Sequence, residues 1–180
     1  VWGENLSLMN LGKLLLELHM PVEAAHFLEH AQQICPSDSS LLNLLAESYK
    51  SSHLDHKTVA VFGALVSLNP DNVAYRRSLA EAFETIGEWE ASLKERSFII
   101  TTNLDGTYSQ MEEDHYKYAH CALKAHQPQI TITACTEILS KNPEDTQALV
   151  YMGEAHIEMD ESKKGLEFLS QATQISPQFA

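Results

Sequence analysis

Residues 39–72 read SSLLNLLAESYKSSHLDHKTVAVFGALVSLNPDN, and this stretch of 34 residues decides the fold. Its proline, Pro70, follows Pro36 by 34 positions, and Pro177 follows Pro143 by the same interval. The interval from Pro70 to Pro143 is 73 positions, which is two such periods plus five residues. A fixed period of about 20–50 residues indicates an array of structural repeats.

Two amphipathic helices are predicted within this stretch. Apolar residues recur at steps of three, four and seven positions, as Leu42, Leu45, Ala46 and Tyr49 in the first half and Val59, Phe62, Leu65 and Val66 in the second. Such steps place side chains on one face of a helix with about 3.6 residues per turn. The polar residues 51–53 separate the two helices, and Pro70 ends the second because it has no N–H group to donate.

The same period runs along the whole chain. The repeats are 5–38, 39–72, 73–106, 112–145 and 146–179, with a short insertion at 107–111. The period and the residues at fixed positions resemble the tetratricopeptide repeat (TPR) family. In the first repeat these residues are Leu11, Gly12, Ala24, Leu28, Ala31 and Pro36. Departures from the family pattern are Thr58, Thr131 and Gly165 in place of alanine, and Leu104 in place of proline.

The resemblance implies an all-α fold. A TPR solenoid is a right-handed α-α superhelix, here of five helix-turn-helix repeats that form a single domain over residues 1–180. One small residue in each repeat is expected where two helices approach closely: Gly12, Ala46, Ala80, Ala119 and Gly153. Asp38, Asn72 and Asp145 are predicted N-caps, because their side-chain oxygens can accept the free N–H groups of the following helix.

Histidine occupies the same inter-helix turn in three repeats, as His19, His53 and His126. Equivalent turns of packed helices lie roughly 10 Å apart, whereas zinc binds nitrogen at about 2.0 Å, so these residues are not a metal site. Histidine tolerates the left-handed backbone conformation better than most residues. We therefore predict left-handed turns at these three positions.

The insertion lies in the third repeat's connection to the fourth. The second helix of the third repeat is predicted to end near Thr102. Ser109 and Glu112 form a capping-box pattern, which predicts that the next helix starts near Gln110. The insertion is either a tolerated surface loop, since added loop length costs little, or a loop that contacts a partner.

Composition excludes several classes of function. The formal net charge of −13 opposes nucleic-acid binding, which depends on Lys and Arg. No apolar run is long enough to cross a membrane. No nucleophile elbow, phosphate-binding loop or metal-ligand spacing is present, so neither catalysis nor a metal or cofactor is expected. The three cysteines, Cys35, Cys121 and Cys135, are interpreted as buried or half-buried thiols in a reducing, cytoplasmic compartment.

The resemblance implies a binding groove formed by the first helix of each repeat. Carried over by position, its candidate residues are Leu6, Met9, Lys13, Asn43, Glu47, Lys50, Arg77, Glu81, Glu84, Tyr116, His120, Leu123, Val150, Glu154 and Ile157. TPR receptors of chaperone tails hold asparagine at one fixed position of the repeat. In the five repeats of this chain that position holds Lys13, Glu47, Glu81, His120 and Glu154. The carboxylate clamp of those receptors is therefore missing.

The predicted partner is another protein, with a basic or amphipathic segment that the glutamates attract. The alternative is a structural spacer, or a scaffold that forms a homo-oligomer through exposed ends of the array. Leu14, Leu15 and Leu16 follow one another in the first repeat, and their surface suits either a neighbouring repeat or a groove wall. Because the chain starts at Val1 and no closing helix follows the fifth repeat, we expect it to be a segment of a longer protein.

Overall fold

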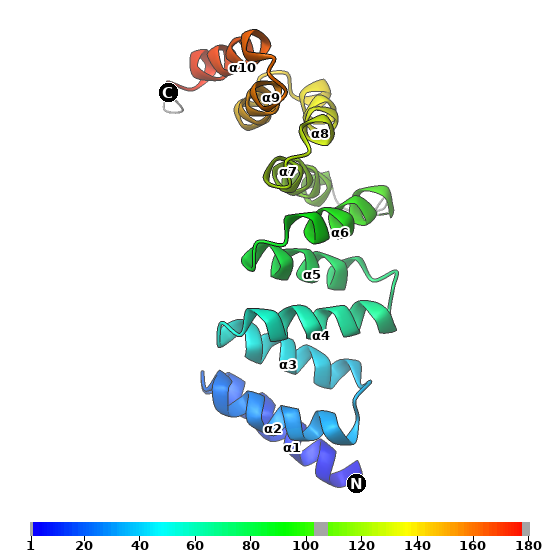
Figure 1. The fold of residues 1–180 in the computed structure, drawn as a ribbon. Helices are drawn as coiled ribbons and strands as arrows, with labels where there is room; N and C mark the ends of the chain where they lie inside the picture. Colours follow the sequence, from blue (N-terminus) through cyan, green and yellow to red (C-terminus); the bar gives the residue numbers. More distant parts are fainter. Residues whose placement is uncertain (1, 103–107, 178–180) are drawn as a thin grey trace. The chain divides into compact units, whose positions relative to one another are not determined.

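The computed structural model describes residues 2–102 and 108–177, and within these ranges it contains ten α-helices and no strand (Figure 1). The helices are α1 (Trp2–Glu17), α2 (Pro21–Ile34), α3 (Ser39–Ser51), α4 (Asp55–Leu68), α5 (Val73–Thr85), α6 (Trp89–Thr102), α7 (Tyr108–Lys124), α8 (Pro128–Lys141), α9 (Thr146–Glu158) and α10 (Ser162–Ile175). Each predicted repeat holds two of them. The predicted all-α class is confirmed.

The helices group into two compact units. Unit 1 is Val1–Gly87, with α1 to α5, and unit 2 is Glu88–Ala180, with α6 to α10. Inside each unit every helix packs on the next one along the chain. The division falls between the two helices of the third predicted repeat, and the single domain over 1–180 stays a prediction.

Unit 1 is built around leucine. Leu28, Leu41, Leu42, Leu45 and Leu65 are all completely buried in one cluster. Complete burial of such a side chain stabilises the fold by about 1.5–3 kcal/mol relative to an exposed one. The leucines come from α2, α3 and α4, so this cluster joins neighbouring repeats as well as the two helices of one repeat.

Unit 2 has smaller side chains in its core. Cys121 and Cys135 are fully buried beside alanines of α7 and α8. Cys35 in unit 1 is partly buried, and all three thiols are free. Burial, with the nearby charge of Asp145 as a smaller cause, raises the pKa of the Cys135 thiol to about 12. The interpretation of the cysteines as buried or half-buried thiols is confirmed.

The three predicted N-caps are confirmed. Asp38 accepts hydrogen bonds from the N–H groups of Ser40 and Leu41 at 2.8 and 3.1 Å. Asn72 caps α5 through the N–H of Tyr75 at 3.2 Å. Asp145 caps α9 in the same way, through the N–H of Ala148 at 2.9 Å.

A left-handed residue stands in the inter-helix turn of every repeat. The φ angles of His19, His53 and His126 are 57°, 55° and 54°, and the equivalent residues Gly87 and Asp160 have φ angles of 77° and 62°. The prediction for the histidines is therefore confirmed. In this conformation the Cβ atom lies too close to the following carbonyl oxygen, and this steric strain costs about 1–2 kcal/mol per residue.

Replacing His53 with glycine is expected to stabilise the chain by roughly 0.5–1 kcal/mol, because glycine adopts positive φ without this strain. The gain is smaller than the strain removed, since glycine also adds freedom to the unfolded chain. Thermal unfolding followed by circular dichroism measures it. The control is His30→Gly, an exposed site inside α2, where the same change should destabilise by about 0.5 kcal/mol or less through lost helix propensity. A lower melting temperature for His53→Gly would contradict the strain argument.

The sequence placed the start of α7 too late. The helix begins at Tyr108, so Ser109 is helical and the capping box with Ser109 as N-cap is wrong. The predicted end of α6 at Thr102 is correct. Residues 108–111 of the insertion are therefore helix rather than loop, while residue 107 lies outside the described residues. With 17 residues, α7 is longer than the first helices α3, α5 and α9, which have 13 each.

Close helix approach occurs at two of the five predicted positions, Gly12 and Gly153. A Cβ atom added to Gly12 would lie 2.5 Å from the side chain of Leu28. In the fifth repeat two glycines face each other. A Cβ atom added to Gly153 would lie 3.0 Å from the carbonyl oxygen of Gly165, and one added to Gly165 would lie 2.8 Å from the carbonyl oxygen of Gly153. Gly165 stands where the family has alanine, and this contact between backbones explains the smaller residue.

Candidate protein-binding surfaces

The first helices of unit 1 carry two hollows in their surface. One, of about 350 Å³, is lined by Asn43, Ala46, Glu47, Lys50, Phe62, Ala74, Tyr75 and Ser78. The other, of about 620 Å³, is lined by Lys13, Leu16, Glu17, His19, Pro21, Leu44, Glu47 and Ser51. Four of the predicted groove residues, Lys13, Asn43, Glu47 and Lys50, therefore share one region of unit 1, and Glu47 contributes to both hollows.

Polar contacts cross this surface between α3 and α5. The Lys50 ammonium lies 3.6 Å from a carboxylate oxygen of Glu81. Asn43 donates a hydrogen bond to the hydroxyl of Tyr75 at 2.9 Å. Because both partners of the Lys50–Glu81 pair are solvent-exposed, the pair adds roughly 0.2–1 kcal/mol at most. Glu81, predicted as an attractor of basic segments, is thus partly neutralised by this lysine.

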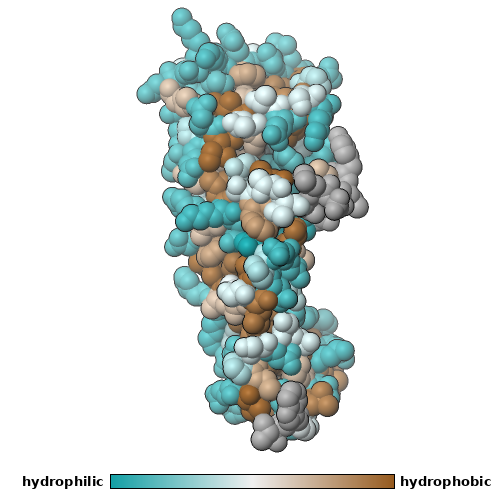
Figure 2. All heavy atoms as spheres, turned by 90° about the vertical axis from the view of Figure 1, so that its right-hand side faces the viewer, coloured by the Kyte–Doolittle hydropathy of each residue, from teal (hydrophilic) through white to brown (hydrophobic). Residues whose placement is uncertain are grey.

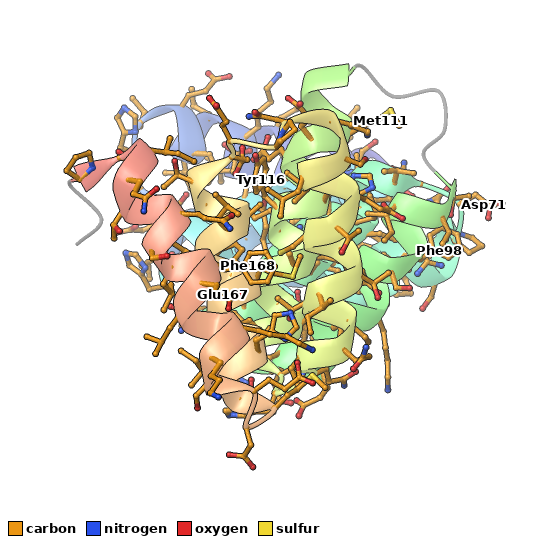
Figure 3. All side chains as sticks on the ribbon, turned by 90° about the horizontal axis from the view of Figure 1, so that it is seen from above. Asp71, Phe98, Met111, Tyr116, Glu167 and Phe168 are labelled. Atoms are coloured by element: carbon orange, nitrogen blue, oxygen red, sulfur yellow. The ribbon has the colours of Figure 1, made fainter. Side chains whose placement is uncertain are left out.

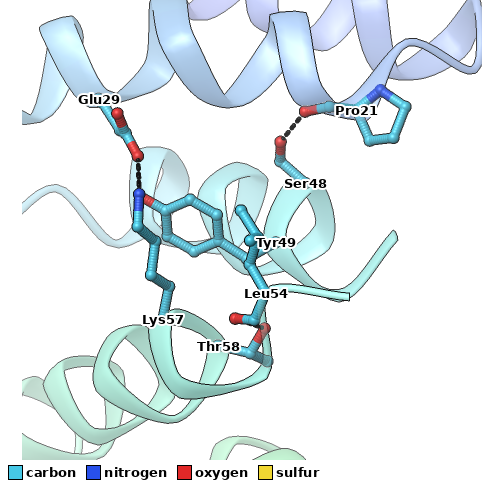
Figure 4. Close-up of polar contacts among 7 residues, drawn as sticks. All are labelled: Pro21, Glu29, Ser48, Tyr49, Leu54, Lys57 and Thr58. Atoms are coloured by element: carbon cyan, nitrogen blue, oxygen red, sulfur yellow. Dashed lines mark hydrogen bonds and ion pairs between the residues drawn. The ribbon is translucent and has the colours of Figure 1, made fainter. Parts of the chain in front are cut away.

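A second polar cluster ties α2, α3 and α4 together (Figure 4). The Tyr49 hydroxyl donates to Glu29 at 2.8 Å, and the Lys57 ammonium donates to the same carboxylate oxygen at 2.7 Å. The hydrogen bond from Lys57, and to a smaller extent the hydrogen bond from Tyr49, hold the pKa of Glu29 below its usual value. Ser48, which is fully buried, donates to the carbonyl of Pro21. These contacts fix the packing of the repeats.

Unit 2 has one larger hollow between α7 and α9. It measures about 510 Å³, and its lining residues are Glu112, Glu113, Tyr116, Lys117, His120, Gln147 and Tyr151. Of these, Tyr116 and His120 were predicted from the sequence. The hollow therefore combines two carboxylates, one ammonium group and three aromatic rings, which is a combination suited to polar recognition.

The aromatic rings beside this hollow form a row. The His120 ring centroid lies 5.9 Å from that of Trp89 at an interplanar angle of 87°. It also lies 5.9 Å from the centroid of Tyr151 at 40°. Both distances fall in the range of favourable aromatic pairs, which are worth about 0.5–1.5 kcal/mol beyond burial. The three rings come from α6, α7 and α9, so the row helps to hold the hollow in shape.

Both tyrosines of the hollow are held neutral. Burial is the largest of the causes that raise the pKa of Tyr116 well above its usual value. The hydrogen bond to Asp145 and the charges of Asp145 and Glu112 raise it further. Tyr116, labelled in Figure 3, donates its hydroxyl to Asp145, which also caps α9. Burial raises the pKa of Tyr151 as well, and Gln147 donates to its hydroxyl at 2.7 Å.

The remaining predicted groove residues are spread more widely. Leu6, Glu154 and Ile157 are exposed, whereas Arg77, Glu84, Leu123 and Val150 are half-buried. Met9 packs against the leucine core of unit 1. None of these eight lines the three hollows described above.

Sequence reasoning missed five lining residues of unit 2's hollow: Glu112, Glu113, Lys117, Gln147 and Tyr151. The spacing of these residues indicates which of them lie together. Gln147 and Tyr151 lie four positions apart, so they share one face of α9. Glu113, Lys117 and His120 likewise follow one face of α7. A search for neighbouring first-helix faces, rather than for family positions, would have found them.

Exposed apolar residues do not add a further large surface on the face shown in Figure 2. There, hydrophobic residues occur in small groups separated by hydrophilic ones. The exposed leucines Leu6, Leu11 and Leu14 of α1, with Leu18 directly after the helix, form another group. No helix within the described ranges has the length and hydrophobicity needed to span a membrane.

Comparison with solved structures identifies the fold. No protein-family model matches the sequence, and no curated protein matches it. YrrB, a TPR protein with an unusual peptide-binding site, is similar over 94% of this chain and 85% of its own, with a TM-score of 0.74 and 15% sequence identity. MamA is similar over 99% of this chain and 94% of its own, with the same TM-score and identity, 0.74 and 15%.

A third match is a kinesin light chain-type protein of Podospora anserina with nearly identical TPR-like repeats. It covers 96% of this chain and 94% of its own, with a TM-score of 0.67 and 16% identity. The chain therefore has the TPR fold, an all-α superhelix of helix-turn-helix repeats, as the sequence predicted.

Proposed function

We propose that the chain is a non-catalytic protein–protein interaction module whose first-helix surfaces bind a segment of another protein. The observation that carries this proposal is the placement of the hollows. In each unit they lie along the first helices and combine exposed charges with aromatic or aliphatic side chains. YrrB, which shares the fold, is described as having a peptide-binding site. The free thiols of the three cysteines support a reducing compartment such as the cytoplasm.

The predicted groove residues define where the segment lies. In unit 1 we assign Lys13, Asn43, Glu47, Lys50 and Glu81, with Arg77 and Glu84 on the same helix as Glu81. In unit 2 we assign Tyr116, His120 and Glu154. Exposed charge pairs with a partner contribute about 0.2–1 kcal/mol each. Burial of apolar side chains near Leu6, Met9, Leu123 and Val150 contributes more per residue.

Selection from a displayed library of random peptides tests the proposal. The selected peptide should bind the chain in a fluorescence-polarisation titration. Glu81→Lys combined with Glu84→Lys should weaken binding about 5–30-fold and reduce its salt dependence, since two attractive charges become repulsive. Tyr116→Ala should weaken it at every salt concentration, since it removes buried ring area.

The matched control is Glu23→Lys combined with Glu167→Lys, two exposed glutamates of the second helices α2 and α10. This control makes the same change of net charge and should leave binding within about twofold, because distant surface charges are screened. Loss of binding in the control but not in the groove variants would overturn the proposal.

The scaffold alternative has one observation in its favour, the exposed leucines of α1. If no peptide is selected, and the chain sediments as a dimer that Leu14→Glu dissociates, self-association through α1 replaces peptide binding as the function. A monomer that binds the selected peptide excludes this alternative.

A further inference from the structure

We propose that the hollow of unit 2 binds the guanidinium group of an arginine side chain in the partner segment. This inference rests on the proposed function and adds the chemistry of one subsite. The subsite consists of Glu112, Glu113, Tyr116, Gln147 and Tyr151, with the His120 ring beside Tyr151.

The rings supply flat surfaces for a planar cation. Tyr116 and Tyr151 both line the hollow, and His120 connects Tyr151 to Trp89 through contacts of 5.9 Å on either side. A guanidinium group within about 6 Å of a ring centroid is attracted by the negative face of that ring. The row is already packed before a ligand arrives, so little ordering is needed on binding.

The carboxylates supply the charge. Glu112 and Glu113 are exposed and line the hollow, and they precede Tyr116 by about one helical turn. Asp145 accepts the Tyr116 hydroxyl, and Glu154 follows Tyr151 on α9. Among the lining residues, the two carboxylates of Glu112 and Glu113 outnumber the one cation, Lys117. Burial is the main cause of the raised pKa values of Tyr116 and Tyr151, and the charges of Asp145 and Glu112 at Tyr116, and of Glu154 at Tyr151, add to it.

Arginine fits this arrangement better than lysine. Its planar fork can stack on a tyrosine while it donates two hydrogen bonds to one carboxylate, whereas an ammonium group is a compact, strongly hydrated point charge. The hollow, at about 510 Å³, is larger than a single side chain. The residues that flank the arginine in the partner segment therefore also enter it.

The test is an NMR titration of the isotopically labelled chain with N-acetyl-arginine amide. We expect backbone amide shifts gathered in residues 112–120 and 147–154. N-acetyl-citrulline amide has nearly the same shape without the charge and should bind at least tenfold more weakly. N-acetyl-lysine amide should bind at least threefold more weakly. Raising the salt from about 50 to 500 mM should weaken arginine binding severalfold, as screening requires.

Two double variants locate the site. Glu112→Gln with Glu113→Gln should weaken binding of N-acetyl-arginine amide at least fivefold. Both side chains are exposed, so the fold is retained. Glu23→Gln with Glu167→Gln removes the same two charges from second helices and should leave the affinity unchanged. Absence of shifts, shifts confined to unit 1, or equal binding of the citrulline compound would each overturn the inference.

The outcomes separate this inference from the function on which it rests. Library peptides that bind the first-helix surfaces without any preference for arginine would overturn the inference and leave the interaction module standing. A library that yields no binding peptide would overturn the proposed function itself. Peptides enriched in arginine, whose binding falls in the Glu112→Gln, Glu113→Gln double variant, would support both.

Discussion

Replacing Ala31 with arginine is expected to lower the melting temperature of the chain by about 10 °C or more. Ala31 is completely buried in α2, within the leucine core of unit 1. α2 packs on both α1 and α3, so an arginine side chain has no short route to water. An uncompensated buried charge costs about 3–5 kcal/mol, and each kcal/mol lowers the melting temperature of a chain of this size by about 2–4 °C.

Thermal unfolding followed by circular dichroism at 222 nm measures this effect. The control is Ala60→Arg, which makes the same substitution at an exposed position of α4 in the same unit. It should change the melting temperature by about 2 °C or less, since most surface substitutions alter stability by no more than about 0.5 kcal/mol. An Ala31→Arg variant that melts like the control would show that α2 does not lie between α1 and α3.

Replacing Gly165 with valine is expected to destabilise the chain by about 1–2.5 kcal/mol. The new Cβ would lie 2.8 Å from the carbonyl oxygen of Gly153 and 2.6 Å from the side chain of Ile157. Ile157 can move, but the backbone of α9 can give way only if the two helices separate. Overpacking of this kind costs about 1–3 kcal/mol, and the better helix propensity of valine returns only a few tenths.

Gly63 in α4 is the matched control for Gly165, because a Cβ added there has no heavy atom within 4 Å. Gly63→Val should therefore leave the stability unchanged or raise it by about 0.5 kcal/mol, through helix propensity alone. Chemical unfolding in urea gives both free energies. Equal effects of the two substitutions would mean that α9 and α10 do not approach as closely as the structure has them.

Local features of the fold were predictable because their causes are local. The period of Pro36, Pro70, Pro143 and Pro177 determines where helix pairs end. The caps at Asp38, Asn72 and Asp145 act on N–H groups two or three residues away. The left-handed turns at His19, His53 and His126 depend on the backbone of a single residue. The start of α7 was wrong because Ser109 and Glu112 match a capping box equally well inside a helix.

The candidate surfaces were predictable only in outline. Family positions located the first helices, and six of the residues at those positions line the hollows: Lys13, Asn43, Glu47, Lys50, Tyr116 and His120. Their part in binding stays a prediction. Family positions could not show that Lys50 contacts Glu81, or that His120 lies between Trp89 and Tyr151. Such contacts join residues about thirty positions apart, and they depend on side-chain rotamers that no spacing determines.

The extra length of α7 makes the first helices of unit 2 differ from each other. With 17 residues against 13 in each of α3, α5 and α9, α7 has four more helical residues than these first helices. At about 1.5 Å per residue, α7 begins roughly 6 Å earlier than its counterpart α9. Identical repeats offer a partner several equivalent positions, shifted by one repeat each. A step beside Glu112 and Glu113 breaks that equivalence, so under the proposed function a segment that lies across α7 and α9 meets two helix starts that differ.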